Sequence, residues 1–563
     1  MYPRPESYLD HAALAQSVTL RDMVSQGRPN SFGPKRFVAL GALQIGALAV
    51  VLASTPFKPF ELDRFFVPKE LALHVAAFVC VLFCLGRLRT LALDRVDFFL
   101  VAFGALSVVS AILASNRWLS TRSVAITISG LAVFWCARSL AASGLKRPLM
   151  AVIVLATVLG AASSLAQAYG LDSDYFTLSR APGGTFGNRN FVAHVSAIGV
   201  PLLVWYAVTA RRAIAVLLCA LGGAILAAAL VLSRSRAAWL ALLVVAILLA
   251  MPVWRAALRV PHADAGRRLV LLGILAAVGV VLSLVLPNRL NWKSDSPYLD
   301  SVRGVVAYNS GSGRGRIIQY RNTLHMVEAY PILGVGPGNW PVHYPRFAAR
   351  NDPSLTRDDN VTANPWPSSD WVALIAERGL VTVVALLLAF AGIIINAFQL
   401  TRGSTANNPD ARDPFLPVAV TATVLIAIAV GFFDAVLILA APAFIVWASL
   451  GALGATGRTR SEWTPSTGSR TRWSLVLVVP LFLFALQSTG MTFAMQAFGT
   501  GDRLGRVEQA AILDPGSYRI QMRLALLALN RQGCALARPH ALRAQAMLPA
   551  AGAPRSVLRH CGG

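Results

Sequence analysis

Long apolar runs alternate with short polar gaps along most of the chain. One helix needs about 20 apolar residues to cross the roughly 30 Å hydrocarbon core of a bilayer. Runs of about that length lie near 37–54, 70–86, 96–114, 122–141, 148–168, 188–208, 212–232, 236–252, 268–286, 373–397, 415–433, 435–455 and 473–493. The pattern predicts an all-α polytopic integral membrane protein with about 12–13 transmembrane helices, depending on how the short runs are divided.

The runs and gaps divide the chain into five parts. A polar N-terminal tail over 1–36 precedes transmembrane helices 1–9 over 37–286, and helices 10–13 follow over 371–496. Between them, 287–370 is too long for a plain connector, so we expect it to form part of a functional site. The tail 497–563 has the alanine and leucine spacing of a helix pair and resembles a tetratricopeptide-like unit.

The polar gaps also indicate how the chain is oriented. Lys and Arg concentrate in alternate gaps, and cytoplasmic loops carry the excess of these residues. This rule places the N-terminus in the cytoplasm, and it places 287–370 and the C-terminus on the outer side of the membrane. The first 36 residues have no short apolar core before a small-residue cleavage site, so we expect no removable signal peptide.

The composition excludes several classes of protein. Only 14% of the 563 residues are charged and 56% are hydrophobic, and the mean hydropathy is +0.59. About a quarter of the residues in a soluble protein are charged, so a soluble enzyme, a disordered chain and a fibrous repeat are excluded. The net charge of +25 does not indicate nucleic-acid binding, because the basic residues lie in short gaps rather than on one wettable surface.

The six cysteines fall into two groups. Four lie inside apolar runs and are expected to be small buried hydrophobic residues. Cys534 and Cys561 lie in the polar tail, where a disulfide can form if the tail faces an oxidising compartment.

Arg234 and Arg236, in LSRSRAAWLALL, form the first candidate site. They lie between two spans with almost no loop, on the side assigned to the outside. Charge at this position is expensive and tends to mark function. Because a guanidinium is a planar fork that suits phosphate oxygens, we expect this pair to bind a phosphorylated lipid headgroup. The alternative is that SRSR is an ordinary cytoplasmic marker.

The second candidate site is SGSGRGRIIQYRNTLHMVEAYPILGVGPGNW, over 310–340. Gly and Ser allow the backbone to bend around an anion, and Arg314, Arg316 and Arg321 can pair with it. The alternative is a flexible basic loop.

The third candidate site is APGGTFGNRNFVAH, at the entry to a span. Asn188 and Asn190 either cap that helix or donate hydrogen bonds to sugar hydroxyls.

The fourth candidate site is ANPWPSSDWVALIAERGLVTV. Ser368, Ser369 and Asp370 have the pattern of a helix N-terminus, where the helix dipole favours an acidic residue. Glu377 and Arg378 lie about two turns further on, which is costly unless they pair or line a cavity.

At these four places the sequence resembles the O-antigen ligase and Wzy-type polymerase superfamily, and the early segment VPKELAL at 67–73 also looks like this family. The resemblance spans most of 37–455. The matching segments are Gly184–Asn190, Ser235–Ala238, Arg316–Trp340 and Ser368–Thr382.

The resemblance implies transfer of a glycan from an undecaprenyl-diphosphate carrier to an acceptor hydroxyl on the outer face of the inner membrane. It implies no metal, nucleotide sugar or other cofactor. The acceptor is the lipid A core in ligases, the growing glycan in polymerases and a protein in related enzymes. Arg236 and Arg316 would stabilise the diphosphate leaving group, assisted by Arg234, Arg314 or Arg321. In-line attack at the anomeric carbon would invert its configuration.

One position departs from the family pattern. Ser368 stands where the ligases have a His that is thought to activate the acceptor hydroxyl, and a serine hydroxyl is no base at neutral pH. Asp370, Glu377, His325 and His343 are alternative bases. Two further alternatives are an enzyme that relies on positioning alone and a protein that has lost the activity.

Three other functions remain open on the sequence. A Wzy-type polymerase needs the same diphosphate site and glycan groove as a ligase. A flippase or transporter would carry internal repeats and charged or broken helices near mid-membrane. A non-catalytic assembly protein would agree with Ser368 and with the repeat-like tail.

Overall fold

The structure is a computed structural model that describes residues 34–85, 91–177, 179–259, 264–292, 294–303, 311–349, 351–402, 413–454, 461–463, 466–499 and 503–562. The described residues are mostly helical, which confirms the all-α fold class. The predicted tail 1–36 lies outside them except for its last three residues, which begin the first helix.

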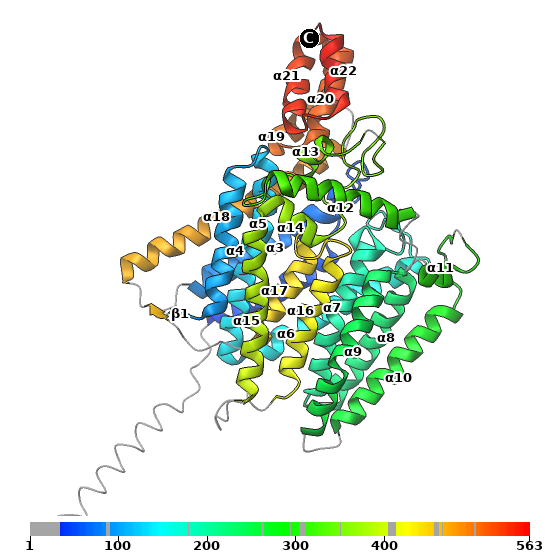
Figure 1. The fold of residues 1–563 in the computed structure, drawn as a ribbon, viewed down its shortest axis with the longest axis vertical. Coiled ribbons are helices and arrows are strands. Elements are labelled where there is room, and N and C mark those ends of the chain that lie inside the picture. The colour runs from blue at the N-terminus through cyan, green and yellow to red at the C-terminus, as the bar shows by residue number, and fades with distance from the viewer. Residues whose placement is uncertain are drawn as a thin grey trace, which may run out of the picture.

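A bundle of apolar helices forms the body of the molecule (Figure 1). In the described residues, ten helical segments are long and apolar enough to cross a membrane. The helices that match the predicted runs are α2 (Pro34–Leu52), α3 (Asp63–Leu85), α4 (Arg95–Ile112), α5 (Arg117–Leu140), α6 (Lys146–Ala168), α7 (Arg189–Val208), α8 (Ala213–Ser233), α9 (Arg236–Arg259), α10 (Asp264–Val285), α15 (Leu380–Arg402), α16 (Leu416–Gly431), α17 (Ala440–Leu453) and α18 (Thr467–Gly499). The shorter α16 and α17 are also apolar.

The segment Arg117–Ala168, 52 residues long, contains two passes rather than one. A short π-helix, Ala141–Leu145, separates α5 from α6, and Gly144 within it has φ 81°, a conformation that favours glycine. Both outer ends of the segment contact the chain that follows α10. The Asn116 N–H at the start of α5 donates to Asn339 Oδ1, and the Arg289 N–H donates to the Ala168 carbonyl at the end of α6. The chain therefore reverses direction near Gly144.

The predicted spans 373–397 and 435–455 are wrong in their first residues. The first is divided at Gly379, where α14 (Asp370–Arg378) ends and α15 begins. Gly379 has φ 79°, and a Cβ there would lie 1.8 Å from the Ile332 carbonyl oxygen, so only glycine allows the two backbones to cross so closely. The second span starts at α17, because the residues before it form the loop that carries Asp434.

Smaller elements mark the two ends of the bundle. At one end, β1 (Leu91–Leu93) pairs antiparallel with β2 (Ser461–Trp463), so the gaps after α3 and α17 lie on the same side. Both gaps are among those assigned to the cytoplasm. The other end, called the loop face below, carries α11 (Pro297–Arg303), α12 (Gly311–Ala329), α13 (Trp340–His343), η2 (Gly184–Phe186), η3 (Tyr344–Arg346) and α14. Figure 1 shows α12 lying across the bundle helices.

The C-terminal helices pack on the loop face, shown in red in Figure 1. They are α19 (Leu504–Leu513), α20 (Tyr518–Gln532), α21 (Cys534–Met547) and α22 (Gly552–His560), and a disulfide joins Cys534 to Cys561. The Asp359 carboxylate accepts hydrogen bonds from the Tyr518 hydroxyl at 2.5 Å and from the Ala553 N–H at 2.6 Å. The tail therefore contacts the same loop that carries much of the candidate site.

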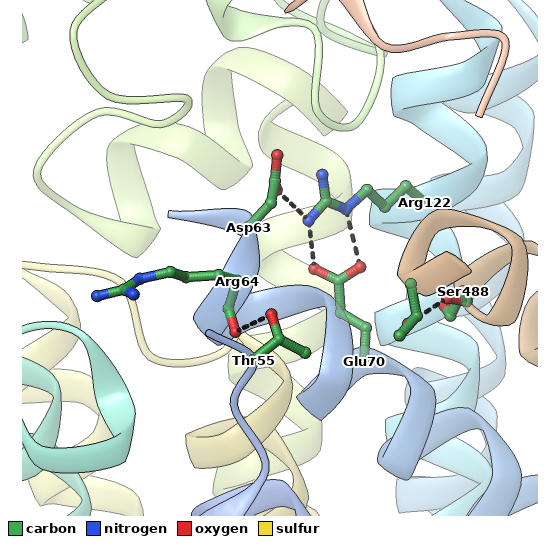
Figure 2. Close-up of polar contacts among 7 residues, drawn as sticks. Thr55, Asp63, Arg64, Glu70, Arg122 and Ser488 are labelled. Carbon is green, nitrogen blue, oxygen red and sulfur yellow. Dashed lines mark hydrogen bonds and ion pairs between the residues drawn. The ribbon is translucent and has the colours of Figure 1, made fainter. Parts of the chain in front are cut away.

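Several charged side chains inside the bundle are paired with each other or with backbone oxygens. Figure 2 shows Arg122 of α5 between two carboxylates of α3, with 2.8 Å to Asp63 Oδ1 and 2.8 Å to Glu70 Oε2. Glu70 belongs to the VPKELAL segment, and its neighbour Lys69 donates to the Val51 carbonyl at 3.2 Å. Buried charges are tolerated only with such partners.

Candidate active site

A cavity of about 650 Å³ opens on the loop face. Its wall combines the starts of α7 and α9, part of α12, the loop before α14 and the loop between α16 and α17. Among the residues that the structure describes, its charged lining consists of Arg180, Arg189, Arg234, Arg236, Asp300, Arg316 and Asp434.

The SRSR segment forms the tight turn between α8 and α9. Arg234 ends α8 with φ 52°, a left-handed conformation that is uncommon for a residue with a side chain. Its guanidinium lies 4.2 Å from the centre of the Trp292 ring and donates to the Pro297 carbonyl at 3.3 Å. Arg236 begins α9, and both arginines line the cavity together with Arg316. SRSR therefore lies on the same side of the helix bundle as Arg316 of α12.

Only one of the three arginines predicted on the second segment reaches the cavity. Arg316 lines it, whereas Arg314 and Arg321 are exposed and do not. The reason is that the chain is helical from Gly311, and two helical residues that are two positions apart point about 200° apart. The predicted bend of the glycine-rich segment around an anion is therefore wrong over Gly311–Arg316.

The arginines of the cavity repel one another. Arg316 is close enough to Arg236, and Arg234 close enough to Arg189, for the positive charges to oppose each other. Burial also lowers the pKa of Arg234, since it removes water from the charged group. An anion between these side chains would relieve the repulsion, and phosphate oxygens fit guanidinium groups well.

Asn188 and Asn190 organise the entrance to α7. Asn188 caps the helix, and its Oδ1 accepts a hydrogen bond of 3.0 Å from the Asn190 N–H. The Asn190 amide donates to Asp434 Oδ2 at 3.3 Å. Both asparagines also line the cavity, so capping and glycan binding are compatible at this position.

Ser368 lies in the cavity wall and is held by two residues of α12. Its N–H donates to Gln319 Oε1 at 2.8 Å, and its carbonyl accepts from the Tyr320 hydroxyl at 2.5 Å. Burial raises the pKa of Tyr320 to about 12, so this hydroxyl stays protonated at neutral pH and acts as a donor.

Asp370 does not line the cavity. It is fully buried, and its carboxylate accepts hydrogen bonds from the backbone N–H groups of Val436 at 3.0 Å and Leu437 at 2.7 Å. Ser369 caps α14 by accepting from the Val372 N–H. Burial raises the pKa of Asp370 to about 7. Asp370 therefore anchors the loop that carries Asp434.

The other three predicted bases also lie outside the cavity lining. Glu377 is buried under the turn before α13, where Oε1 accepts from the Trp340 N–H at 3.1 Å, and burial raises its pKa to about 7. His343 Nε2 lies 2.6 Å from Ser115 Oγ. His325 is exposed on α12 and lies 3.1 Å from Glu328. Glu377 and Arg378 therefore do not line this cavity. The Arg378 guanidinium donates instead to the hydroxyl groups of Ser107 on α4 and Thr127 on α5.

Several cavity residues were not singled out by the sequence, among them four that are basic, acidic or titratable. Arg180 and Arg189 flank the GTFGN segment, and His194 lies one helical turn after Asn190. Asp434 is an acidic residue between two apolar runs. Charge beside or inside a span is itself a functional signal, and this signal could have identified His194 and Asp434.

A second cavity of about 910 Å³ adjoins the first. The two share Arg180, Arg189, Arg234 and Asp300 in their walls, and the second is also lined by Trp292. The shared arginines lie between two spaces, so a diphosphate there would have room for a bulky group on either side.

Residues 221–387 match the family model described as O-antigen ligase. This match supports the resemblance to the O-antigen ligase superfamily. This O-antigen ligase domain runs from within α8 to the first turns of α15 and includes Arg234, Arg236, Arg316 and Ser368. It supports a glycan ligase or polymerase type of activity in a multi-pass bacterial membrane protein. Comparison with curated proteins finds no significant match.

The domain does not contain the whole candidate site. Asn188, Asn190 and His194 precede it and Asp434 follows it, yet all four line the same cavity. The start of α7 and the loop between α16 and α17 therefore complete the cavity outside the matched residues.

Proposed function

We propose that this protein transfers a glycan from an undecaprenyl-diphosphate carrier to an acceptor hydroxyl, as an O-antigen-ligase-like enzyme. The observation that carries the proposal is the convergence of Arg236 and Arg316 on one cavity, beside Arg189 and Arg234. Two pairs of these arginines repel each other, which favours a doubly charged anion such as a lipid-linked diphosphate.

The chemistry needs a stabilised leaving group above all. When the acceptor oxygen attacks the anomeric carbon, negative charge develops on the departing diphosphate, and preorganised guanidinium groups stabilise that charge. Attack in line with the leaving group inverts the anomeric carbon. The proposed reaction uses no metal ion and no nucleotide sugar, as the resemblance implies.

The carrier and acceptor determine the location of the reaction. A lipid-linked donor remains in the bilayer, and a cavity at the loop face gives its diphosphate access to residues at the ends of α8 and α9. We place the loop face and the C-terminus in the periplasm and the N-terminus in the cytoplasm, on the distribution of Lys and Arg. The acceptor is the lipid A core in the ligase form of the proposal.

A Wzy-type polymerase is the second candidate function, because the same domain match includes both activities. In that case the acceptor is another glycan and the product is a longer surface polysaccharide.

Deletion of the gene tests the proposal. Surface glycan and lipid-linked glycan are compared on gels for the deletion strain and for the strain complemented with the wild-type protein. Loss of glycan from the lipid A core together with build-up of the lipid-linked donor supports the ligase. A change confined to glycan chain length supports the polymerase. An unchanged profile in the deletion strain contradicts both.

A further inference from the structure

His194 is a buried side chain that lines the candidate cavity without a hydrogen-bond partner. It is 1% exposed, and neither Nδ1 nor Nε2 has a partner among the residues that the structure describes. Its nearest ring neighbour is Phe191, at 6.1 Å between centroids, which cannot pair with these nitrogens. Buried polar groups are normally hydrogen-bonded, so the partner of His194 is expected to be a molecule in the cavity.

The fold places His194 beside the groups that the transfer needs. Asn190 and His194 are four residues apart on α7 and therefore share one face of the helix. Asn190 donates to Asp434, and the charges of Asp434 and Arg316 both act on the His194 ring. His194, Asp434 and Arg316 thus line the same cavity, and both charges are close enough to act on the imidazole.

We propose that His194 is the general base of the glycan transfer, in the role that the resembled ligases give to the His replaced by Ser368. This inference rests on the proposed function. As the acceptor oxygen bonds to the anomeric carbon, its proton moves to a ring nitrogen of His194. The bond between the anomeric carbon and the diphosphate oxygen breaks, and its electron pair leaves with the diphosphate, which Arg236 and Arg316 stabilise.

Asp434 acts on His194 through its charge rather than through a hydrogen bond. Proton uptake makes the imidazole positive, and the nearby carboxylate stabilises that charge while Arg316 opposes it. Asp434 is itself held by Asn190 Nδ2 and by the Ala435 N–H at 2.9 Å. The arrangement provides an imidazole with a carboxylate nearby, although the two come from positions 240 residues apart in the sequence.

A transfer assay with purified protein tests this inference. Solubilised membranes of the deletion strain supply the native lipid-linked donor and the native acceptor, and transfer is measured on gels after each variant is added. Undecaprenyl diphosphate binding is measured in parallel by thermal stabilisation. General-base assistance is worth about 10²–10⁴-fold, so His194→Gln should slow transfer by at least about 100-fold and keep binding. His325→Gln changes an exposed histidine outside the cavity and should match the wild type.

Chemical rescue separates proton transfer from packing. Imidazole in the medium should restore His194→Ala at least about tenfold, and Asp434→Asn should be slowed without rescue. Transfer by His194→Gln within threefold of the wild-type rate would overturn the inference and leave the proposed function intact. Loss of undecaprenyl diphosphate binding in both His194 variants would assign the side chain to packing and also overturn it. If wild-type protein fails to restore transfer to the deletion membranes, the proposed function itself is wrong.

Discussion

The Asn190 side-chain amide donates a hydrogen bond of 3.3 Å to Asp434 Oδ2, although 244 residues separate the two positions. This contact joins the entrance of α7 to the loop between α16 and α17, and both residues line the cavity that also contains Arg236 and Arg316. The cavity is thus closed by segments on both sides of the O-antigen ligase domain.

Arg236→Ala and Arg316→Ala should each slow glycan transfer by about 10²–10³-fold, because each removes a donor that stabilises the leaving diphosphate. Arg321→Ala is the matched control, since Arg321 belongs to the same helix as Arg316 but is exposed and outside the cavity. Rates are measured with purified variants and membranes of the deletion strain. Equal loss in Arg321→Ala would show that only the general positive charge of the loop face matters.

Asp370→Asn should destabilise the protein by about 1–3 kcal/mol, because an amide nitrogen cannot accept the hydrogen bonds that the carboxylate accepts from the Val436 and Leu437 N–H groups. Thermal unfolding in detergent measures the change. Transfer per folded molecule should persist. A stable variant without any transfer would instead support the prediction of Asp370 as a base.

Much of the fold could be predicted from the sequence, because an apolar run long enough to span a membrane predicts a helix. The break at Gly379 was missed, since the close crossing with Ile332 depends on tertiary packing. Arg234 and Arg236 could be identified because charge between two spans is unusual. The helix over Gly311–Ala329 was not predicted, because Gly313 and Gly315 are unfavourable inside a helix. The direction in which Arg314 points could therefore not be predicted either.

The proposed general base, His194, could not be predicted from the sequence as the helices could. Asp370 has the sequence position of a helix N-terminus beside Ser368, but backbone groups from a loop 66 residues later surround its carboxylate. His194 lies in an apolar run, where a histidine is usually a packed core residue. Only the folded chain shows that its nitrogens are unpaired and that Asp434 is near.

Arg122→Gln should destabilise the protein by about 3–5 kcal/mol, because it leaves the nearly buried Glu70 carboxylate without its cation. Lys58→Gln is the matched control. Lys58 and Asp174 are 2.6 Å apart, but their side chains are 60% and 64% exposed, so its unfolding temperature should stay near that of the wild type. Equal unfolding temperatures for the two variants would contradict the importance of the buried ion pair.

Stability should fall as the pH rises from about 4 to 7. Burial raises the pKa of Asp370 from 3.8 and that of Glu377 from 4.5, each to about 7, so the folded protein holds these protons in a range where the unfolded chain has released them. Glu377→Gln should flatten this dependence by about 3 kcal/mol at most. Unfolding temperatures of the variant and the wild type at pH 5 and pH 7 measure the difference, and an identical slope in both would contradict the assignment.

Binding of undecaprenyl diphosphate to the purified protein in nanodiscs tests the central claim most directly. The account predicts that the wild-type protein binds undecaprenyl diphosphate at least about tenfold more tightly than undecaprenol, that Arg236→Ala and Arg316→Ala together abolish this preference, and that Arg321→Ala keeps it. Equal affinity of the wild-type protein for the two lipids would contradict the proposal that this cavity holds a lipid-linked diphosphate.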